Sequence, residues 1–594
     1  MNITFLGGAD EIGASSILIE VAGRQILVDA GMRPNKQGAA ALPDLERIEG
    51  RLDAVILTHA HADHLAGLPV VHQRWPEVPV YTSRPTAALA KIMLVDSAYL
   101  QTLQSETPLY GREDVNRTVD MMRPLLLNRW YHLTDGVAVC LSQAGHLLGA
   151  ASVLMDTAEG RLAISGDVSV THQRAVTGFA APPFQADVLI LESTYGDNDH
   201  PPRWEEERRL VENVSEVVEG GGIALVPSFA LGRAQEVMLA LRQAQMVGEA
   251  PQFPIYADGL VRAISDVYNR QREWLAPALQ EMSGHVFWQD RRVMKVKSPQ
   301  RRRILGRPAC IVASSGMLFG GPSVFYAEQL IEEPQNAIFI TGYTDEESPG
   351  RRLQELGTGD MLTLNGEPYQ VGCQVRRFGL SGHADASELV QIARHFGPRE
   401  IYLVHGESAG RQGLKARLEA EVAPVILPGR GQKVKLPLPK WMGGERPFLL
   451  DRDDKTLAPS DAPVAVINIG GEAQAVIPRL GIQRPQKKLE GAMVREEIET
   501  PFRCILCRQE KLLTIDLSRR QLLWHCSECE HTYEEMITNV KAKDIKRMND
   551  NEQVLLLDFI QVSVWLHEPV LDKNWRDLVA QPELWRGWLE EEEG

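Results

Sequence analysis

The chain is short of the features that mark secreted and membrane proteins. Seven cysteines in 594 residues are too few for a disulfide-rich scaffold. No apolar run approaches the roughly 18 residues that a membrane helix needs. The first residues, MNITFLGGADEIG, lack the basic region and apolar core of a secretory signal. We therefore expect a cytoplasmic protein that does not cross a membrane.

Positive charge is also in deficit. The formal net charge of -16 argues against a nonspecific nucleic-acid coat. Charges are screened over roughly 8 Å at physiological salt, so a local basic groove could still hold a phosphate backbone. The hydrophobic and charged fractions, 44% and 24%, are those of an ordinary folded protein, and the length suggests several domains.

Four apolar runs typical of buried strands each end on a reactive side chain. DAVILTH ends on His59, RLAISGD on Asp167, ADVLILES on Glu192 and EIYLVH on His405. The fold class that we expect is α/β, because such strands alternate with helical segments. Functional groups in layered α/β folds collect just beyond strand ends. The pattern predicts one site that is assembled from distant segments.

The stretch HAHADH carries metal-ligand chemistry. His59 and His61 are two residues apart, so in an extended segment both imidazoles project to the same side and suit one metal ion. Asp63 and His64 precede a predicted helix over 65–75, where a carboxylate is favoured and can face a second ion. A solvated polar turn is the alternative. Three of the chain's 15 histidines within six residues favour metal binding.

This stretch resembles the HxHxDH signature of the metallo-β-lactamase fold, an αββα sandwich. Further counterparts follow in order: Asp29 in LVDAG, His146 in AGHLLGA and Asp167 in SGDVS. The resemblance implies two catalytic zinc ions, one held by His59, His61 and His146, the other by Asp63 and His64, with Asp167 between them. It also implies that Asp29 orients a ligand histidine without touching metal.

Downstream segments resemble the β-CASP nucleases, a family that includes the cleavage and polyadenylation factor endonuclease and its bacterial and archaeal relatives. In that family a cap domain interrupts the lactamase fold. The matching segments are ESTYG (192–196), PSFALGRAQE (227–236), SSGMLFGGPS (314–323), TGYTDEESPGRRL (341–353), LSGHADASEL (380–389) and YLVHGE (402–407). We expect a metallo-β-lactamase domain in two parts, 1–197 and 377–438, around a β-CASP cap over 198–376.

The resemblance implies a zinc-dependent phosphodiesterase with Asp63, Glu192 and His383 as catalytic residues. Two zinc ions lower the pKa of a shared water from 15.7 toward about 7, which supplies hydroxide. His383, charged by Glu192, would be the general acid, a role worth about 10² to 10⁴ in rate. His405 would complete the second metal's ligand set. Its presence favours RNA over DNA as substrate.

Two other functions stay open on the sequence. One is a DNA nuclease of the same fold in repair or defence, and the other is an inactive scaffold paralogue. The scaffold is disfavoured because no matched ligand position is lost. Whether cleavage is internal or from an end, and from which end, is not encoded in any pattern that we identify.

The cap segments supply candidates for substrate binding. Backbone amides at helix starts and arginine side chains suit phosphates. The candidates are Ser228, Arg233, Ser315, Tyr343 and Arg351. Ordinary ion pairs between domains are the alternative for the arginines. The run RRVMKVKSPQRRR, 291–303, carries seven basic residues and could line an RNA path or form a solvated loop.

Beyond the nuclease, residues 439–500 form a linker or small module of unknown role. Two CxxC pairs follow, and their C-x2-C-x18-C-x2-C spacing predicts a zinc ribbon over 501–532 with a hairpin between the pairs. One structural zinc would be held by Cys504, Cys507, Cys526 and Cys529. A disulfide framework is disfavoured by the cytoplasmic expectation. The tail, 533–594, is predicted helical, and its tryptophans suggest a protein partner. A homo-oligomer is left open.

Overall fold

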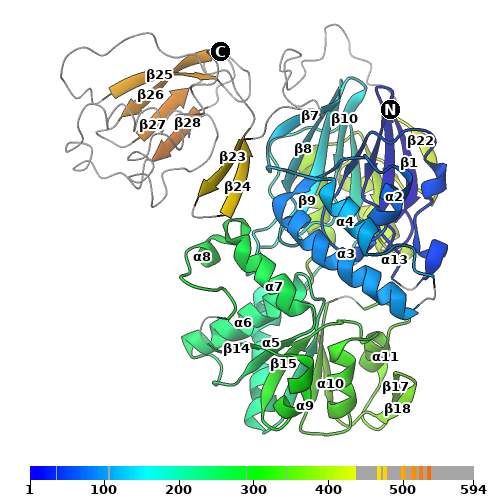
Figure 1. Cartoon of the computed structure of the whole chain (residues 1–594), viewed down its shortest axis with the longest axis vertical. Coiled ribbons are helices and arrows are strands. Elements are labelled where there is room, and N and C mark those ends of the chain that lie inside the picture. The colour runs from blue at the N-terminus through cyan, green and yellow to red at the C-terminus, as the bar shows by residue number, and fades with distance from the viewer. Residues whose placement is uncertain are drawn as a thin grey trace. The chain divides into compact units, whose positions relative to one another are not determined.

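The computed structural model describes residues 1–436, with breaks at 35, 105–106, 135, 289–290 and 343, and six strands within 465–536. The chain divides into two units, Met1–Leu450 and Asp451–Gly594. Each unit is described by itself, and Figure 1 labels their elements. Among the described helices, none has the length and apolar content that a membrane crossing requires.

Two seven-stranded sheets form the core of the first unit. The first sheet has the order β22-β1-β2-β3-β4-β5-β6 and the second the order β21-β20-β11-β10-β9-β8-β7. The strands of the first are β1 (Asn2–Gly7), β2 (Ser16–Val21), β3 (Arg24–Val28), β4 (Ala54–Ile56), β5 (Val80–Ser83), β6 (Met122–Leu125) and β22 (Lys433–Lys435). Those of the second are β7 (Trp130–Thr134), β8 (Val137–Gln143), β9 (Ala151–Thr157), β10 (Gly160–Ile164), β11 (Val188–Glu192), β20 (Glu400–Val404) and β21 (Val425–Ile426).

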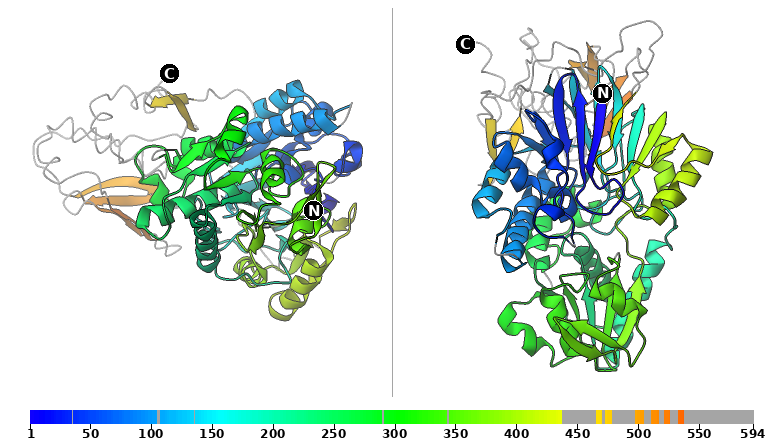
Figure 2. Two further views of the ribbon diagram at one scale, coloured as in Figure 1. Left: turned by 90° about the horizontal axis from the view of Figure 1, so that it is seen from below. Right: turned by 90° about the vertical axis from the view of Figure 1, so that its right-hand side faces the viewer.

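The two sheets pack face to face and helices cover their outer faces. Alternate apolar side chains, such as Phe5 and Ile19 from the first sheet and Val139 and Ile190 from the second, meet in one buried core. The covering helices are α1 (Ala62–Leu65), α2 (Leu68–Arg74), α3 (Arg84–Gln104), α4 (Arg112–Asp120), α12 (Ala386–Phe396) and α13 (Ser408–Glu421). The right-hand view of Figure 2 shows the layers edge on. The predicted αββα sandwich is confirmed.

The helix predicted over 65–75 is interrupted. Helix α1 ends at Leu65 and α2 begins at Leu68. Between them, the amide of Gly67 donates to the carbonyl of Ala30 at 2.7 Å, and a Cβ on Gly67 would lie 2.9 Å from the same oxygen. The close approach of β3's exit segment therefore requires glycine and divides the helix.

The cap is a second α/β layer inserted between two neighbouring strands of the sandwich. Strands β11 and β20 pair in parallel, although residues 193–399 separate them. The cap sheet has the order β14-β13-β15-β12-β16-β19, and all five neighbouring pairs are parallel. Its strands are β12 (Ile223–Pro227), β13 (Ile255–Asp258), β14 (Val293–Lys295), β15 (Ala309–Ala313), β16 (Ala337–Thr341) and β19 (Gln374–Phe378).

Seven helices and a small hairpin complete the cap. The helices are α5 (Arg203–Glu219), α6 (Arg233–Val247), α7 (Val261–Arg270), α8 (Pro277–Gln280), α9 (Arg301–Ile304), α10 (Pro322–Leu330) and α11 (Pro349–Glu355), and the hairpin is β17 (Met361–Leu364) with β18 (Glu367–Gln370). Short 3-10 turns lie at Gly38–Ala41, Leu45–Arg47, Arg272–Trp274 and Ser298–Gln300. Because parallel strands share one carboxyl edge, the loops that follow β12, β15 and β16 gather there.

The described strands of the second unit form two antiparallel sheets. Strands β23 (Ala465–Ile469) and β24 (Glu472–Ile477) form one, and β25 (Glu497–Arg503), β26 (Glu510–Asp516), β27 (Gln521–His525) and β28 (Thr532–Met536) form the other in sequence order. The hairpin predicted between the CxxC pairs is confirmed as β26 and β27. The cysteines Cys504, Cys507, Cys526 and Cys529 lie outside the described residues. The first residues of the tail, predicted helical, instead form β28 because they pair with β27.

Candidate metal centre and catalytic site

The predicted convergence of strand ends is observed. Asp29 follows β3, His59 follows β4, Asp167 follows β10, Glu192 ends β11 and His405 follows β20. Strands β3 and β4 are parallel neighbours, as are β10, β11 and β20. Their carboxyl ends therefore lie at one end of the sandwich, where loops from both sheets meet.

Three groups of possible ligand atoms lie at or beside Asp167; one joins it to Glu192, His383 and His405, and the other two contain the predicted metal ligands. In the first of these two, His59, His61, His146 and Asp167 place one atom each within 4.8 Å of the others. In the second, Asp63, His64 and His405 do the same. Every residue predicted to hold the two catalytic ions belongs to one of these groups.

Asp167 offers one carboxylate oxygen to each of these two groups. Its Oδ2 lies 3.4 Å from Nε2 of His59 and 3.7 Å from Nε2 of His146. Its Oδ1 lies 3.3 Å from Nε2 of His64 and 3.4 Å from Nδ1 of His405. One carboxylate therefore links the two groups of ligand atoms.

The chemistry of these residues fits metal binding. Nε2 of His59, Nε2 of His64 and Oδ1 of Asp167 are buried atoms that find no hydrogen-bond partner among the described residues. Buried polar atoms are normally satisfied, so three orphans that face one another indicate missing partners. Imidazole nitrogens and carboxylate oxygens are also a donor set that divalent metals prefer.

The electrostatics agree with this interpretation. Burial and the neighbouring imidazoles lower the pKa of His59 and of His146 well below the ordinary histidine value, which keeps both rings neutral and able to donate a lone pair. Burial also lowers the pKa of His64, but Asp167 and Asp29 outweigh it and raise that pKa well above its ordinary value. The carboxylates thus create a negative site that attracts a cation.

Asp29 supports the centre from behind. Its Oδ1 accepts from the amide of Thr58 at 2.8 Å, and its Oδ2 accepts from the Thr58 hydroxyl at 2.8 Å. The same Oδ2 lies 2.7 Å from Nδ1 of His64. Asp29 therefore fixes the ring of a predicted ligand, as expected from the sequence, while Thr58 was not singled out.

The buried Glu192 pairs with the half-buried His383 beside the centre. Nδ1 of His383 lies 3.0 Å from both carboxylate oxygens of Glu192. Glu192 also accepts from the amide of Val168 at 2.8 Å and from the Thr194 hydroxyl at 2.6 Å. Nε2 of His383 then faces Asp167, at 3.9 Å from Oδ2. Thr194 stands two residues after Glu192, a proximity that could have identified it from the sequence.

The pair favours a protonated imidazole. Burial alone lowers the pKa of His383, but the charges of Glu192 and Asp167 outweigh it and raise the pKa to about 9. Helix α12, which follows His383, is capped by Asp385, whose carboxylate accepts from the amide of Glu388. His383 is thus free for chemistry at the centre.

Arg233, one of the substrate residues predicted in the cap, has the charge and the hydrogen-bond donors that suit a phosphate. It begins α6, and its Nη1 is buried without a hydrogen-bond partner in the described part of the chain. Burial and the nearby Arg203 lower its pKa to about 10, so it remains a cation at neutral pH. A Cβ built on Gly382, beside His383, would lie 3.5 Å from Arg233 Nη2. The guanidinium therefore borders the loop that carries the proposed acid.

The other predicted substrate residues are placed less favourably. Ser228 is fully buried, and its hydroxyl donates to the Val226 carbonyl. The Ser315 hydroxyl donates to Gly320 within its own loop. Arg351 pairs with Glu355 on the same helix at 3.0 Å, the ion-pair alternative. Tyr343 lies outside the described residues.

Two basic residues of the run 291–303 form ion pairs with acidic residues of the cap. Arg301 pairs with the buried Asp258 at 2.7 Å, and Lys295 pairs with Asp266 at 2.7 Å.

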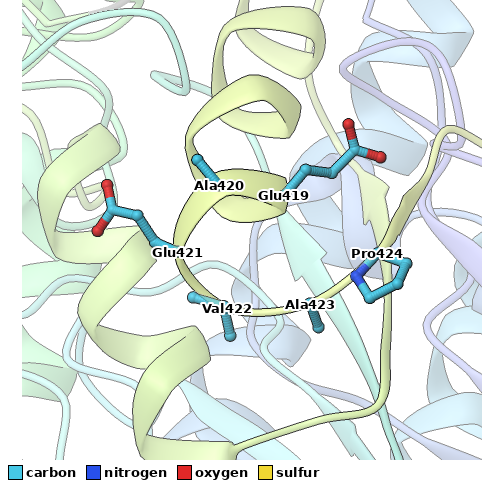
Figure 3. Close-up of a pocket in the computed structure, with 6 residues that line it drawn as sticks. All are labelled: Glu419, Ala420, Glu421, Val422, Ala423 and Pro424. Carbon is cyan, nitrogen blue, oxygen red and sulfur yellow. The ribbon is translucent and has the colours of Figure 1, made fainter.

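An open hollow at the end of α13, shown in Figure 3, contains none of the predicted site residues. It is lined by Glu419, Ala420, Glu421, Val422, Ala423 and Pro424. The three described lone cysteines, Cys140, Cys310 and Cys373, are buried free thiols.

Three protein-family models match successive parts of the chain. The Metallo-beta-lactamase superfamily model matches residues 9–213, the Beta-Casp domain model matches 234–353, and the model of the Zn-dependent metallo-hydrolase RNA specificity domain matches 368–428. RNase aCSPSF2 of Saccharolobus solfataricus is 30% identical over 443 residues, which cover 73% of this chain and 85% of that protein. The chain belongs to the β-CASP family of the metallo-β-lactamase superfamily.

Other β-CASP relatives are similar at the same level. The transcription termination factor FttA of Thermococcus kodakarensis is 32% identical over 440 residues, which cover 69% of this chain and 67% of that factor. The RNase J-like protein of Methanocaldococcus jannaschii is 30% identical over 409 residues, 68% of this chain and 92% of that protein. The family predicted from the motifs is thus confirmed. The family model and the candidate His and Asp site described above support binding of a divalent metal.

Proposed function

We infer that this protein is a metal-dependent ribonuclease that hydrolyses phosphodiester bonds in RNA. The observation that carries the inference is the pairing of a two-group ligand cluster with the Glu192–His383 pair beside it. The metal-ligand cluster alone would indicate only some metal-dependent hydrolase. Departure of a sugar oxygen from a phosphodiester is helped by a nearby proton donor, which the Glu192–His383 pair supplies.

We propose zinc as the metal, with two ions per site. His59, His61 and His146 would hold one ion, Asp63, His64 and His405 the other, and Asp167 both. When bound, the ions supply Lewis acidity that activates water and neutralises charge on the phosphate. The ligand set fits zinc because neutral imidazoles and carboxylates are its common partners.

The chain's own residues supply the rest of the chemistry. Glu192 holds Nδ1 of His383, so Nε2 points at the centre and gives its proton to the departing oxygen. Nη1 of Arg233, which finds no hydrogen-bond partner among the described residues, lies near the same loop and would bind a phosphate oxygen. A carboxylate at Asp63 is held in place by Nε2 of His405 at 3.1 Å.

RNA is favoured over DNA by the relatives. Those named above include two proteins called RNases and a transcription termination factor, and the model matching 368–428 is described as an RNA specificity domain. The inactive scaffold is disfavoured because all seven predicted ligand residues are present and assembled.

Cleavage of labelled single-stranded RNA, single-stranded DNA and duplex DNA tests the function. We expect RNA to be cut, and Asp63→Asn and His383→Ala to abolish or greatly reduce cleavage, the latter with its metal retained. Cleavage of DNA alone would contradict the RNA assignment. Absence of any cleavage by the metal-loaded protein would indicate a scaffold.

Four further properties are proposed from the sequence. They are a zinc ion in the ribbon, a protein partner for the tail, a cytoplasmic location and a homo-oligomer. Elemental analysis of the full chain should find about three zinc ions, two in the catalytic site and one in the ribbon. A value near one would contradict the dinuclear site.

A further inference from the structure

His383 stands on a loop that is held from two sides. The acid loop, residues 379–385, joins β19 of the cap to α12 of the sandwich. On the sandwich side, Ala384 donates its amide to the Val168 carbonyl at 2.6 Å, and the Gly382 carbonyl lies 2.7 Å from Nδ1 of His146. These contacts tie the loop to the segments that carry Asp167 and His146.

On the cap side, the first turn of α5 holds the same loop. Glu206 accepts from the amide of Gly379 at 2.5 Å, and Arg203 Nη1 donates to the Ser381 carbonyl at 2.9 Å. The hydroxyl of Ser381 in turn accepts from the amide of His383 at 3.0 Å. Two side chains of one helix thus fix the backbone on the approach to the proposed acid.

Arg203 is itself locked by two buried acids. Its Nε donates to Glu207 at 3.1 Å and its Nη2 to Glu236 at 3.1 Å. The exposed fractions of the side chains are 11% for Arg203, 9% for Glu207 and 3% for Glu236. The guanidinium therefore has a fixed direction, since rotating it would leave buried charges unpaired.

The same acids reach the segment that follows Asp167. Glu236 accepts from the amide of Arg174 at 2.7 Å and from that of Ala175 at 2.8 Å, while Glu207 accepts from Arg174 Nε at 2.8 Å. Cap helices α5 and α6, the acid loop and the metal-ligand segment are consequently joined by one network of charge-assisted hydrogen bonds.

We propose that Arg203 and Glu206 are positioning residues for His383, so that the seating of the cap on the sandwich sets the geometry of the acid. The inference rests on the proposed function. In that reaction water adds to phosphorus and the bond to the leaving sugar oxygen breaks. The leaving oxygen takes a proton from His383, and the water releases one to solvent. Displacing the loop would leave metal and substrate bound but would delay this proton.

Two variants and a matched control test the proposal. Arg203→Lys keeps a cation but cannot serve three acceptors in fixed directions. Glu206→Gln keeps the shape and weakens the bond to the acid loop. Arg208→Met is the control, because Arg208 lies on the same helix, is 64% exposed and pairs only weakly with Glu212 at 3.6 Å. Metal content and thermal melting are measured for each variant.

The substrates are ordinary RNA and RNA with sulfur in place of one bridging oxygen, each bridging position being tried. A thiol has a pKa of about 8.5, so the sulfur departs without a donated proton. On ordinary RNA we expect kcat of Arg203→Lys and of Glu206→Gln to fall by about tenfold or more with KM unchanged. A general acid typically raises the rate by about 10² to 10⁴. On the sulfur substrate we expect their rates to approach that of the wild type, as for His383→Ala.

The outcomes distinguish the acid role of His383 from the positioning role of Arg203 and Glu206. Rescue of His383→Ala by sulfur without rescue of Arg203→Lys and Glu206→Gln would overturn the positioning role and leave the acid in place. Failure of sulfur to rescue His383→Ala would overturn the acid role and the positioning inference together. If Arg203→Lys does not fold, Glu206→Gln decides alone, since it keeps the ion pairs of Arg203 with Glu207 and Glu236 and removes only the pair of Glu206 with Arg209.

Discussion

Both carboxylate oxygens of Glu192 lie 3.0 Å from Nδ1 of His383. Glu192 is itself 1% exposed and fixed by the amide of Val168. The imidazole therefore has one nitrogen committed to the carboxylate and the other turned to the metal centre. A charge that raises the pKa of one ring should determine how cleavage depends on pH.

Glu192→Gln should move the alkaline limb of the pH–rate profile to lower pH. In the wild type the proposed acid loses its proton as pH rises through about 9. Removing the negative charge of Glu192 lowers the pKa of His383, so activity is lost earlier as pH rises. Initial rates of RNA cleavage across the neutral and alkaline range would show it. An unmoved limb would contradict the pairing, and Glu355→Gln on the surface of α11 serves as control.

Asp29→Asn should weaken metal binding. Its carboxylate accepts from Thr58 and meets Nδ1 of His64, and an amide cannot accept on both sides. Loss of such an orienting partner typically costs about 10- to 100-fold in metal affinity. Competition with a chelator measures the change. Asp53→Asn, a shielded aspartate that pairs with Arg24, is the control, and equal affinities for the two variants would refute the prediction.

Arg233→Met should reduce RNA affinity and its salt dependence. Nη1 of Arg233 lacks a hydrogen-bond partner within the described part of the chain and would suit one phosphate. Each phosphate contact on a single strand contributes about 0.7 to the slope of log affinity against log salt. Binding is measured at several salt concentrations with the Asp63→Asn variant as background. Arg351→Met should change little, because Arg351 is exposed and pairs with Glu355. Identical slopes for both arginine variants would argue against a phosphate at Arg233.

Gly31→Ala should displace the HAHADH turn. A Cβ on Gly31 would lie 1.6 Å from the carbonyl oxygen of Asp63, a backbone atom that cannot yield without moving the ligand segment. We expect loss of bound metal and a lower melting temperature. Gly111→Ala is the control, since no atom lies within 4 Å of its added Cβ. Normal metal content in Gly31→Ala would show that the turn tolerates the shift.

Local patterns were sufficient for much of the fold and for the ligand set. The spacing of His59 and His61, and the apolar runs that end on Asp167, Glu192 and His405, depend on neighbouring residues and on the period of a strand. The helix over 65–75 was predicted as continuous because no pattern reveals that Gly67 must approach Ala30. The predicted ribbon zinc stays a prediction.

Only the tertiary structure decided which groups act together. The two oxygens of Asp167 face different ligand groups. Among the described substrate candidates, only Arg233 has a buried donor atom without a hydrogen-bond partner in the described part of the chain. Arg203 and Glu206 look in the sequence like ordinary charges on a helix, since Arg203 pairs with Glu207 four residues on. Their bonds to the acid loop span 178 and 173 residues. Such contacts leave no local signature, because their partners are backbone atoms that only the fold brings near.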